Sequence, residues 1–368
     1  MAVDDMPVPT PPVSSARPGT LQRVDDWVEE RLGWHQLAGV LLHVRVPIRA
    51  KTFFFGGITL FLFGVQIATG TLLALYYKPT PEAAYDSVIF ITSDLDFGWL
   101  IRSVHHWAAN LMILFLVLHM IRIFFQAAYK YPRELTWIVG MGLLGVTMLF
   151  GFTGYLLPWD QRAYWATVVG TEIAGGIPII GDFALEVLRG GADVTEATLS
   201  RFFGIHVLVL PLMLGAIVAV HLVFVHQQGL ADPKEADPRP PAVPTGRTKP
   251  FFPNYILEEV IAWLFLLAIL VVMASIWPAG LEEEANPLVT PEHTKPEWYF
   301  LGVYELLKHI PIKVVGILTP VVFLAILALL PFLDRNPEIR ARKRPVAIFL
   351  GIVTIAVLIG LTIWGYVS

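Results

Sequence analysis

Seven long apolar runs divide the 368-residue chain, and each is long enough to cross a bilayer as a helix, which takes about 20 residues. Only 15% of the residues are charged, against roughly 25% in an ordinary soluble domain. The sequence therefore predicts an all-α integral membrane protein with seven transmembrane helices. The predicted spans lie near residues 53–77, 100–125, 136–157, 203–227, 256–277, 314–333 and 345–366.

The distribution of positive charge predicts the orientation of these spans. With a cytoplasmic N-terminus, the cytoplasmic segments are the N-terminal region and the loops after the second, fourth and sixth spans. Most of the 26 Lys and Arg residues lie in these segments, whereas the acidic stretch 282–284 lies in an external loop. Because cytoplasmic loops of membrane proteins are enriched in Lys and Arg, we expect a multi-pass protein of a bacterial plasma membrane with its N-terminus inside.

The segments between and before the spans predict five regions. Residues 1–20 are rich in Pro and Ser and predict a disordered tail. Residues 21–44 carry apolar side chains at helical intervals, which predicts an amphipathic helix on the membrane surface or against a partner. Residues 45–228 form a four-helix bundle in this interpretation, 229–253 a proline-rich cytoplasmic linker, and 254–368 a three-helix C-terminal domain.

Two external stretches predict short helices lying at the outer interface. Residues 158–170 and 296–309 both mix aromatic and charged residues with apolar residues at helix-compatible spacing. The chain contains no cysteine, which excludes disulfides, iron–sulfur ligation and thioether attachment of haem. Any haem on this chain would therefore be bound non-covalently.

Four histidines inside two of the spans carry the strongest functional signal. His105 and His119 are fourteen residues apart, which on a helix is about 21 Å with an offset of about 40° in direction. His206 and His221 are fifteen apart on the fourth span, within about 60° of one face. The second and fourth spans run in the same direction, so His105 and His206 share an outer level, and His119 and His221 an inner level.

Two histidines at each of two matched levels predict two bis-imidazole sites. A single intramembrane histidine would be read equally well as a satisfied core residue or a proton relay. A tetrapyrrole iron instead takes one neutral imidazole on each face. With both axial positions filled, O₂ has no place to bind, and electron transfer is the expected chemistry.

Glycine spacing supports this interpretation independently. Gly56 and Gly70 are fourteen residues apart on the first span, and Gly140 and Gly154 are fourteen apart on the third. Glycines in transmembrane helices usually allow close helix packing. Two pairs at the interval of the histidines fit better with flat macrocycles that lie against bare backbone at two levels.

Two arginines lie beside the predicted ligands. Arg102 and Arg122 are each three residues from a histidine of the second span, His105 and His119. At this spacing their guanidinium groups could pair with the propionates of a haem. The alternative is that both extend along the helix toward the membrane surface.

With these residues in view, the sequence resembles the cytochrome b family over residues 45–366. The motifs that carry the resemblance are GGITLFLFGVQIATG, RSVHHWAANLMILFLVLHMIR, PRELTW, GYLLPWDQRAYW and PEWYF. The fifteen-residue spacing in the fourth span and the seven-span count are similar to the plastid and cyanobacterial form. In that form the first four and last three spans are separate proteins, whereas here they are fused.

Two positions depart from the plastid form. A cysteine that attaches an extra haem in that form is replaced here by Phe54. His226 stands where the respiratory form has a histidine at its inner quinone site and the plastid form usually has arginine. The resemblance therefore implies an inner quinone site of the respiratory kind at His226, unless this residue is only interfacial.

The PEWYF motif is similar to the outer quinol site of the family. The resemblance implies that Glu297 accepts a proton from quinol and that Tyr299 lines the site, together with Pro296, Trp298 and Tyr155. Partial burial in an aromatic setting would raise the pKa of such a carboxyl toward neutrality. Without the resemblance, the motif would be read as an interfacial aromatic belt with a capping glutamate.

The family further implies the reaction, the cofactors and the partners. A quinol at the outer site gives one electron to a Rieske iron–sulfur protein and one to the outer of two b-type haems. The inner haem then reduces quinone near the cytoplasm, and protons are released outside. The expected partners are the Rieske protein, a c-type cytochrome and a second copy of the complex in the lipid bilayer, with no nucleic acid.

Two other functions stay open on the residues alone. A di-haem membrane anchor of another quinone-linked oxidoreductase would explain the histidines but not PEWYF. A proton-coupled transporter would carry intramembrane histidines, but it has no need of two matched pairs.

Overall fold

The computed structural model describes residues 19–32, 44–47, 54–229, 248–291 and 295–368. Within these ranges the chain is mostly helical, and six helical segments are long and apolar enough to cross a membrane. This confirms the predicted all-α membrane fold. The six are α3 (Phe55–Ala74), α5 (Gly98–Phe125), α6 (Glu134–Tyr155), the run Glu196–Gln228 that ends in α10 (Leu210–Gln228), the run Phe251–Ile276 that ends in α11 (Ile256–Ile276), and α15 (Pro345–Val367).

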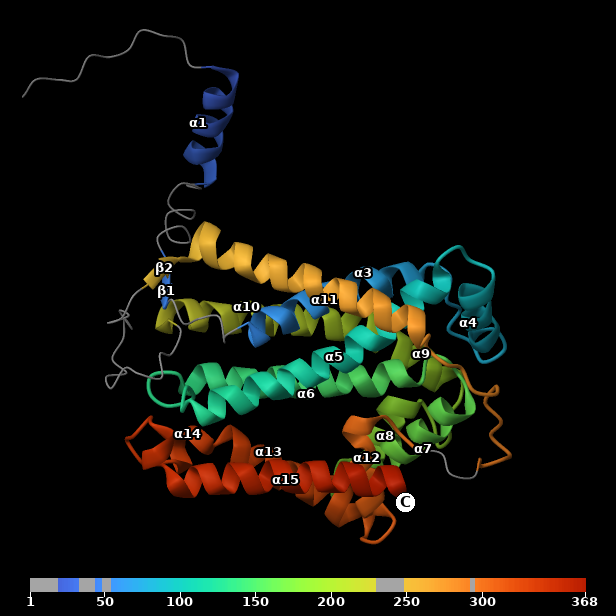
Figure 1. The fold of residues 1–368 in the computed structure, drawn as a ribbon. Coiled ribbons are helices and arrows are strands. Elements are labelled where there is room, and N and C mark those ends of the chain that lie inside the picture. Colours follow the sequence, from blue (N-terminus) through green and yellow to red (C-terminus); the bar gives the residue numbers. More distant parts are fainter. Residues whose placement is uncertain (1–18, 33–43, 48–53, 230–247, 292–294) are drawn as a thin grey trace, which may run out of the picture.

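Four of these helices form the predicted bundle. Helix α3 packs along α5, and α10 packs along α6, around a core of buried apolar side chains. Helix α11 lies against α5 and α3 on one side of the bundle, whereas α13 (Thr319–Ala328) and α15 lie on the opposite side against α6 and α5 (Figure 1). The buried core residues are Leu62, Ala108, Met112, Val146, Leu210, Leu214, Leu266 and Leu270.

The predicted span 314–333 is less regular than the others. It consists of the π-turn η4 (Lys313–Leu318), α13 and the single turn α14 (Leu330–Leu333), and its continuous apolar helix is the shorter segment Lys313–Ala328. Helix α13 ends at Ala328, and its C-cap residue Leu329 lies two residues before Pro331. Proline lacks the N–H that a continuing helix needs, which accounts for the break.

The fourth span contains a π-turn that the sequence did not reveal. The turn η2 (Ile205–Val209) includes His206 and leads directly into α10, whose second residue is Pro211. A π-turn inserts one extra residue into a helix, and such turns occur mostly at functional sites. Fifteen residues in this span therefore cover nearly the same height as fourteen in α5, which brings the two pairs of histidines to matched levels.

Short helices cover one end of the bundle. The predictions for residues 158–170 and 296–309 are confirmed by α7 (Gln161–Gly175) and α12 (Trp298–Leu307), and the Asp160 side chain caps α7 through the Ala163 N–H. Three further short helices were not predicted, because their mixed polar and apolar residues give a weak periodic signal. They are α4 (Ala84–Ser93), α8 (Gly181–Arg189) and α9 (Glu196–Gly204).

At the opposite end, two short strands join the halves of the chain. Strand β1 (Arg45–Pro47) pairs antiparallel with β2 (Thr248–Pro250), which leads through η3 (Phe251–Tyr255) into α11. Helix α1 (Thr20–Leu32) forms within the predicted amphipathic segment, with Leu21 and Trp27 exposed. Most of the predicted tail, the rest of residues 21–44 and the middle of the linker lie outside the described residues.

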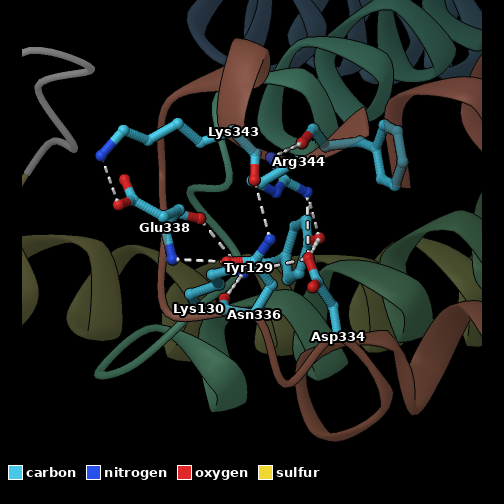
Figure 2. A network of polar contacts seen from close by, with 8 residues as sticks. Tyr129, Lys130, Asp334, Asn336, Glu338, Lys343 and Arg344 are labelled. Carbon is cyan, nitrogen blue, oxygen red and sulfur yellow. Dashed lines mark hydrogen bonds and ion pairs between the residues drawn. The ribbon is translucent and has the colours of Figure 1, made fainter. Parts of the chain in front are cut away.

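A polar network clamps this end of α15 to the loop after α5 (Figure 2). Lys130 and Arg344 lie 3.0 and 3.1 Å from the Asp334 carboxylate, and the Tyr129 hydroxyl donates to the same oxygen at 2.5 Å. The Arg344 side chain, which follows the short turn η5 (Ala341–Lys343), is completely buried. Burial raises the pKa of Asp334, but the hydrogen bonds from Tyr129 and Lys130 and the two cations outweigh it and hold this pKa below its usual value. The carboxylate therefore stays ionised and holds both cations.

Candidate functional site

His105 and His206 face each other across the bundle. We call their level outer and that of His119 and His221 inner, after the predicted orientation. The centroids of the His105 and His206 rings are 6.5 Å apart, with an interplanar angle of 70°. Two nitrogen–metal bonds of about 2 Å, plus about 1 Å from each nitrogen to its ring centre, give roughly 6 Å between centroids. The spacing of this pair therefore fits one metal ion held between two imidazoles.

Each outer histidine contacts a threonine hydroxyl through Nδ1. The distance to Thr69 Oγ1 of α3 is 2.8 Å for His105, and the distance to Thr153 Oγ1 of α6 is 3.1 Å for His206. Both hydroxyls also contact a backbone carbonyl one turn earlier, that of Val65 at 2.7 Å and that of Leu149 at 2.8 Å. A hydroxyl has one proton to donate, and a carbonyl only accepts.

These contacts determine which ring nitrogen can bind a metal. Because each threonine gives its proton to the carbonyl, its oxygen accepts a hydrogen bond from Nδ1–H of the histidine. The neutral imidazole then carries its free lone pair on Nε2. Both outer histidines are therefore held in the tautomer that presents Nε2 as a ligand.

The inner pair has different surroundings. His119 and His221 are close enough to interact electrostatically, as expected of residues that share a level. Their Nδ1 atoms are buried and have no hydrogen-bond partner of standard geometry among the described residues. The Thr136 carbonyl interacts with the His221 ring, but no side-chain hydroxyl reaches either imidazole in the way that Thr69 reaches His105.

Each of the four predicted glycines faces one of the four histidines. A Cβ atom added at Gly154 would lie 2.5 Å from the His206 ring, and one added at Gly70 would lie 3.1 Å from His105. At the inner level the corresponding distances are 3.3 Å from Gly56 to His119 and 3.6 Å from Gly140 to His221. The glycines therefore leave room for the imidazoles, and at Gly154 a larger residue would collide with the ring.

The donor set fits a haem better than a bare metal ion. No group of three or more His, Asp or Glu side chains comes together in the described ranges. A bare metal ion held by protein usually has at least three protein ligands, whereas an iron in a tetrapyrrole needs only the two axial ones. Two facing imidazoles with glycines behind them are therefore suited to a haem.

The two predicted propionate partners lie at different ends of α5. Arg102 donates to the carbonyls of Ala279 and Gly280 at 2.8 and 2.6 Å, which anchors the chain after α11. Arg122 lies near Tyr255 at the inner level and interacts with it electrostatically. Contact with haem propionates stays a prediction for both.

The PEWYF residues lie where α12 reaches the bundle. The Trp298 indole donates to Asn110 Oδ1 of α5 at 2.9 Å. Tyr299 packs against Gly151 of α6, where an added Cβ would lie 3.1 Å from its ring. Glu297 immediately precedes α12 and is half-buried, so the motif places a carboxylate beside the outer part of α6.

Arg162 links this carboxylate to the surrounding groups. It forms an ion pair with Glu282 and interacts electrostatically with Tyr155 and Glu297. Burial raises the pKa of the Glu297 carboxyl, and Arg162 lowers it only in part. Burial and the Glu297 charge raise the pKa of Tyr299 as well. The structure thus brings Glu297, Tyr299 and Tyr155 together around one site, and places Pro296 and Trp298 beside them.

At the inner end, the structure adds a residue to those predicted. His226 is exposed in the last turn of α10. Glu259 of α11 is only 8% exposed and lies against Gly57, where an added Cβ would come within 2.6 Å of its carboxylate. Gly57 is the neighbour of Gly56, which faces His119, so a buried carboxylate lies close to the inner pair.

The sequence analysis missed Glu259, Thr69 and Thr153. A signal existed for Glu259, since an ionisable residue inside an apolar helix is a functional candidate by default. The threonines gave a weaker signal, because each directly precedes a predicted glycine, Gly70 or Gly154, but threonine in a helix commonly bonds to the preceding turn without any further role.

Comparisons with known proteins show the family to which the chain is similar. The family model described as Cytochrome b/b6/petB matches residues 43–229, and the model described as Cytochrome b(C-terminal)/b6/petD matches residues 284–368. The chain is 40% identical over 365 residues to "Cytochrome bc complex cytochrome b subunit" of Chlorobaculum thiosulfatiphilum, which covers 96% of this chain and 82% of that protein.

Of two further comparisons, one covers about half of the chain and the other covers nearly all of it. Cytochrome b6 of Prochlorococcus marinus (strain MIT 9303) is 45% identical over 211 residues, which are 57% of this chain and 97% of that protein. The solved structure titled "Hyperthermophilic respiratory Complex III" superposes with a TM-score of 0.82 at 36% identity, over 93% of this chain and 91% of that one.

Proposed function

The chain belongs to the cytochrome b/b6 family as the fused b subunit of a bc-type oxidoreductase complex, and we propose that it oxidises quinol at an outer site and returns electrons to quinone at an inner one. Two non-covalent b-type haems, held by histidines of the bundle, would supply the electron carriers between these sites. The observation that carries the proposal is the pairing of His105 with His206 in the same structure that brings Glu297 beside the outer end of the bundle.

Four histidines hold the cofactors in this proposal. His105 and His206 bind the outer iron, and His119 and His221 bind the inner one. A haem bound at each level supplies a one-electron carrier, so a two-electron quinol must give its electrons to two acceptors. With two imidazoles supplied by the protein at each level, a haem held there would serve electron transfer and not O₂ activation.

Glu297 is the proton acceptor at the outer site. Its raised pKa makes it a stronger base than an ordinary carboxylate, which suits proton transfer from a quinol hydroxyl near neutral pH. Tyr299 and Tyr155 line the site, and Arg162 lies on the side of Glu297 toward Glu282 in the external loop. Arg162 and Glu282 therefore lie between Glu297 and the outer aqueous phase, into which its proton would be released.

His226 and Glu259 are the proton-delivering candidates at the inner site. Quinone reduction consumes protons, so this site needs titratable groups near the cytoplasm. His226 is exposed and can exchange protons with water, and Glu259 lies buried beside the inner pair. Uptake on one side and release on the other would couple electron transfer to proton translocation.

The remaining centres come from partner subunits. The chain contains no cysteine, so a Rieske iron–sulfur protein and a c-type cytochrome would receive the first electron of each quinol. We expect the complex to be a dimer in a bacterial plasma membrane, with the N-terminus of this chain in the cytoplasm.

Quinol-dependent reduction of cytochrome c by the purified complex tests this function. The wild-type complex is expected to be active, and Glu297→Gln is expected to keep both haems while it loses most of this activity. A di-haem anchor of another enzyme would carry the haems without the activity, and a transporter would carry neither. Either result would contradict the proposal.

A further inference from the structure

Side-chain hydroxyls contact the histidines at one level only. Thr69 and Thr153 come from two different helices, yet each accepts a hydrogen bond from Nδ1 of an outer histidine, at 2.8 and 3.1 Å. At the inner level, no side-chain hydroxyl of the described residues contacts Nδ1 of His119 or Nδ1 of His221, and only the Thr136 carbonyl interacts with the His221 ring. Chemically identical ligands therefore have unequal surroundings at the two levels.

The contact is not a general property of threonine in these helices. Thr71 of α3 donates to the Ile67 carbonyl at 2.7 Å, and Thr147 of α6 donates to the Leu143 carbonyl at 2.8 Å. Both make the same bond to the preceding turn as Thr69 and Thr153, and no histidine contact is present at either position. One threonine in each helix thus has the additional role, and a matched neighbour does not.

A hydrogen bond accepted from Nδ1–H changes the ligand as well as its orientation. It draws the Nδ1 proton away and makes Nε2 more basic, which strengthens the bond to the metal. The oxidised iron carries more positive charge and gains more from a basic ligand than the reduced iron does. Hydrogen bonding around axial ligands is one of the means by which proteins set haem potentials.

We propose that Thr69 and Thr153 are positioning residues that fix Nε2 of His105 and His206 toward the outer iron and lower the reduction potential of the outer haem relative to the inner one. The two hydrogen bonds would favour the oxidised state of a haem held by His105 and His206. The inference rests on the proposed haem ligation and is independent of quinol oxidation.

The test compares matched variants of the purified complex by redox titration of the haem absorption bands. Thr69→Val and Thr153→Val remove the hydroxyl and keep the shape of the side chain. We expect the double variant to shift the outer midpoint upward by about 59 mV, which is a tenfold change in the equilibrium constant for one electron. The inner midpoint should not move, and Thr71→Val and Thr147→Val should leave both midpoints unchanged.

Serine variants keep the test decisive if valine prevents haem binding. Thr69→Ser and Thr153→Ser retain the hydroxyl, so they should retain the outer haem at its wild-type midpoint. An unchanged outer midpoint in the double valine variant, an equal shift of both haems, or a shifted midpoint in the serine variants would overturn the proposal. Absence of two haems from the wild-type complex would instead refute the proposed function, before any variant is compared.

Discussion

The outer and inner levels of the bundle use the same ligands in unequal surroundings. At the outer level, threonine hydroxyls orient both imidazoles, Gly154 lies so close to His206 that a Cβ would collide, and α12 brings Glu297 to the same end. At the inner level the glycines stand farther off, and the Nδ1 atoms have no side-chain hydroxyl beside them. The two levels therefore differ in the contacts that surround the histidines and not in the residue type, and the proposed difference in haem potential rests on these contacts.

Removing one predicted haem ligand should have the largest effect, because it should empty one level and leave the other occupied. We expect His119→Ala to lose the inner haem and keep at least part of the outer one, because the outer ligands come from other turns of the same helices. His206→Ala should give the opposite result. Pyridine haemochrome assays and low-temperature spectra of the purified variants measure this, and retention of both haems in either variant would exclude these residues as ligands.

Alanine at the glycines tests how closely each imidazole is held. Gly154→Ala should lose most of the outer haem, because its Cβ would lie 2.5 Å from the His206 ring. Gly140→Ala is the matched change at the inner level, where 3.6 Å is ordinary van der Waals contact, so a smaller loss is expected. The haem content per chain gives the answer, and equal losses would show that the closer contact at Gly154 has no effect.

Glu297→Gln should affect only the function of the outer level. We expect the rate of quinol oxidation to fall about 100-fold with both haems present, since a positioned general base contributes typically 10²–10⁴-fold. Burial raises the pKa of Glu297, so its basic form accumulates only as pH rises through that raised value. The wild-type rate should increase with pH over this range, and Glu297→Gln should lose the increase. An unaltered pH profile in the variant would contradict the assignment.

Changing the Asp334 network in Figure 2 should have the smallest effect on the two haem potentials. Asp334→Asn leaves the buried Arg344 and Lys130 without their carboxylate and should destabilise the protein by roughly 3–5 kcal/mol, with both haem potentials unchanged. Glu338→Gln is the control, because its pair with Lys343 is partly exposed and such pairs contribute about 0–1 kcal/mol.

The same network predicts a pH dependence of stability. The pKa of Asp334 is lowered in the folded protein, so its contribution is present above the unfolded pKa and is lost as pH falls through the folded value. Thermal unfolding of the wild type and of Asp334→Asn between neutral and acidic pH measures this dependence. A wild-type advantage over Asp334→Asn that persisted at low pH would contradict it.

Periodicity and spacing made most of the fold, and the pairing of His105 with His206, predictable. Hydrophobic runs mark the spans, and intervals of fourteen and fifteen residues place His105 with His206 because helix geometry is nearly fixed. The π-turn at Ile205–Val209 was not predictable, because the extra residue follows from the missing N–H of Pro211 and from packing. The break near Pro331 likewise depends on local geometry that an apolar run conceals.

The threonine and glutamate contacts needed the tertiary structure. Thr69 meets His105, and Thr153 meets His206, across helix interfaces. Both directly precede a predicted glycine, Gly70 or Gly154, but this position alone does not show which way the hydroxyl points. Glu259 gave a signal by its charge, but its approach to Gly57 depends on how α11 packs on α3. Contacts between helices follow from packing, which single-helix patterns do not contain.

A redox-titrated visible spectrum of the purified complex, with a pyridine haemochrome count, tests the central claim most directly. Two bis-histidine levels with unequal surroundings predict two b-type haems per chain that titrate at separate midpoints, the outer one lower. A chain that carries one haem or none, or two haems that titrate as a single component, would contradict it.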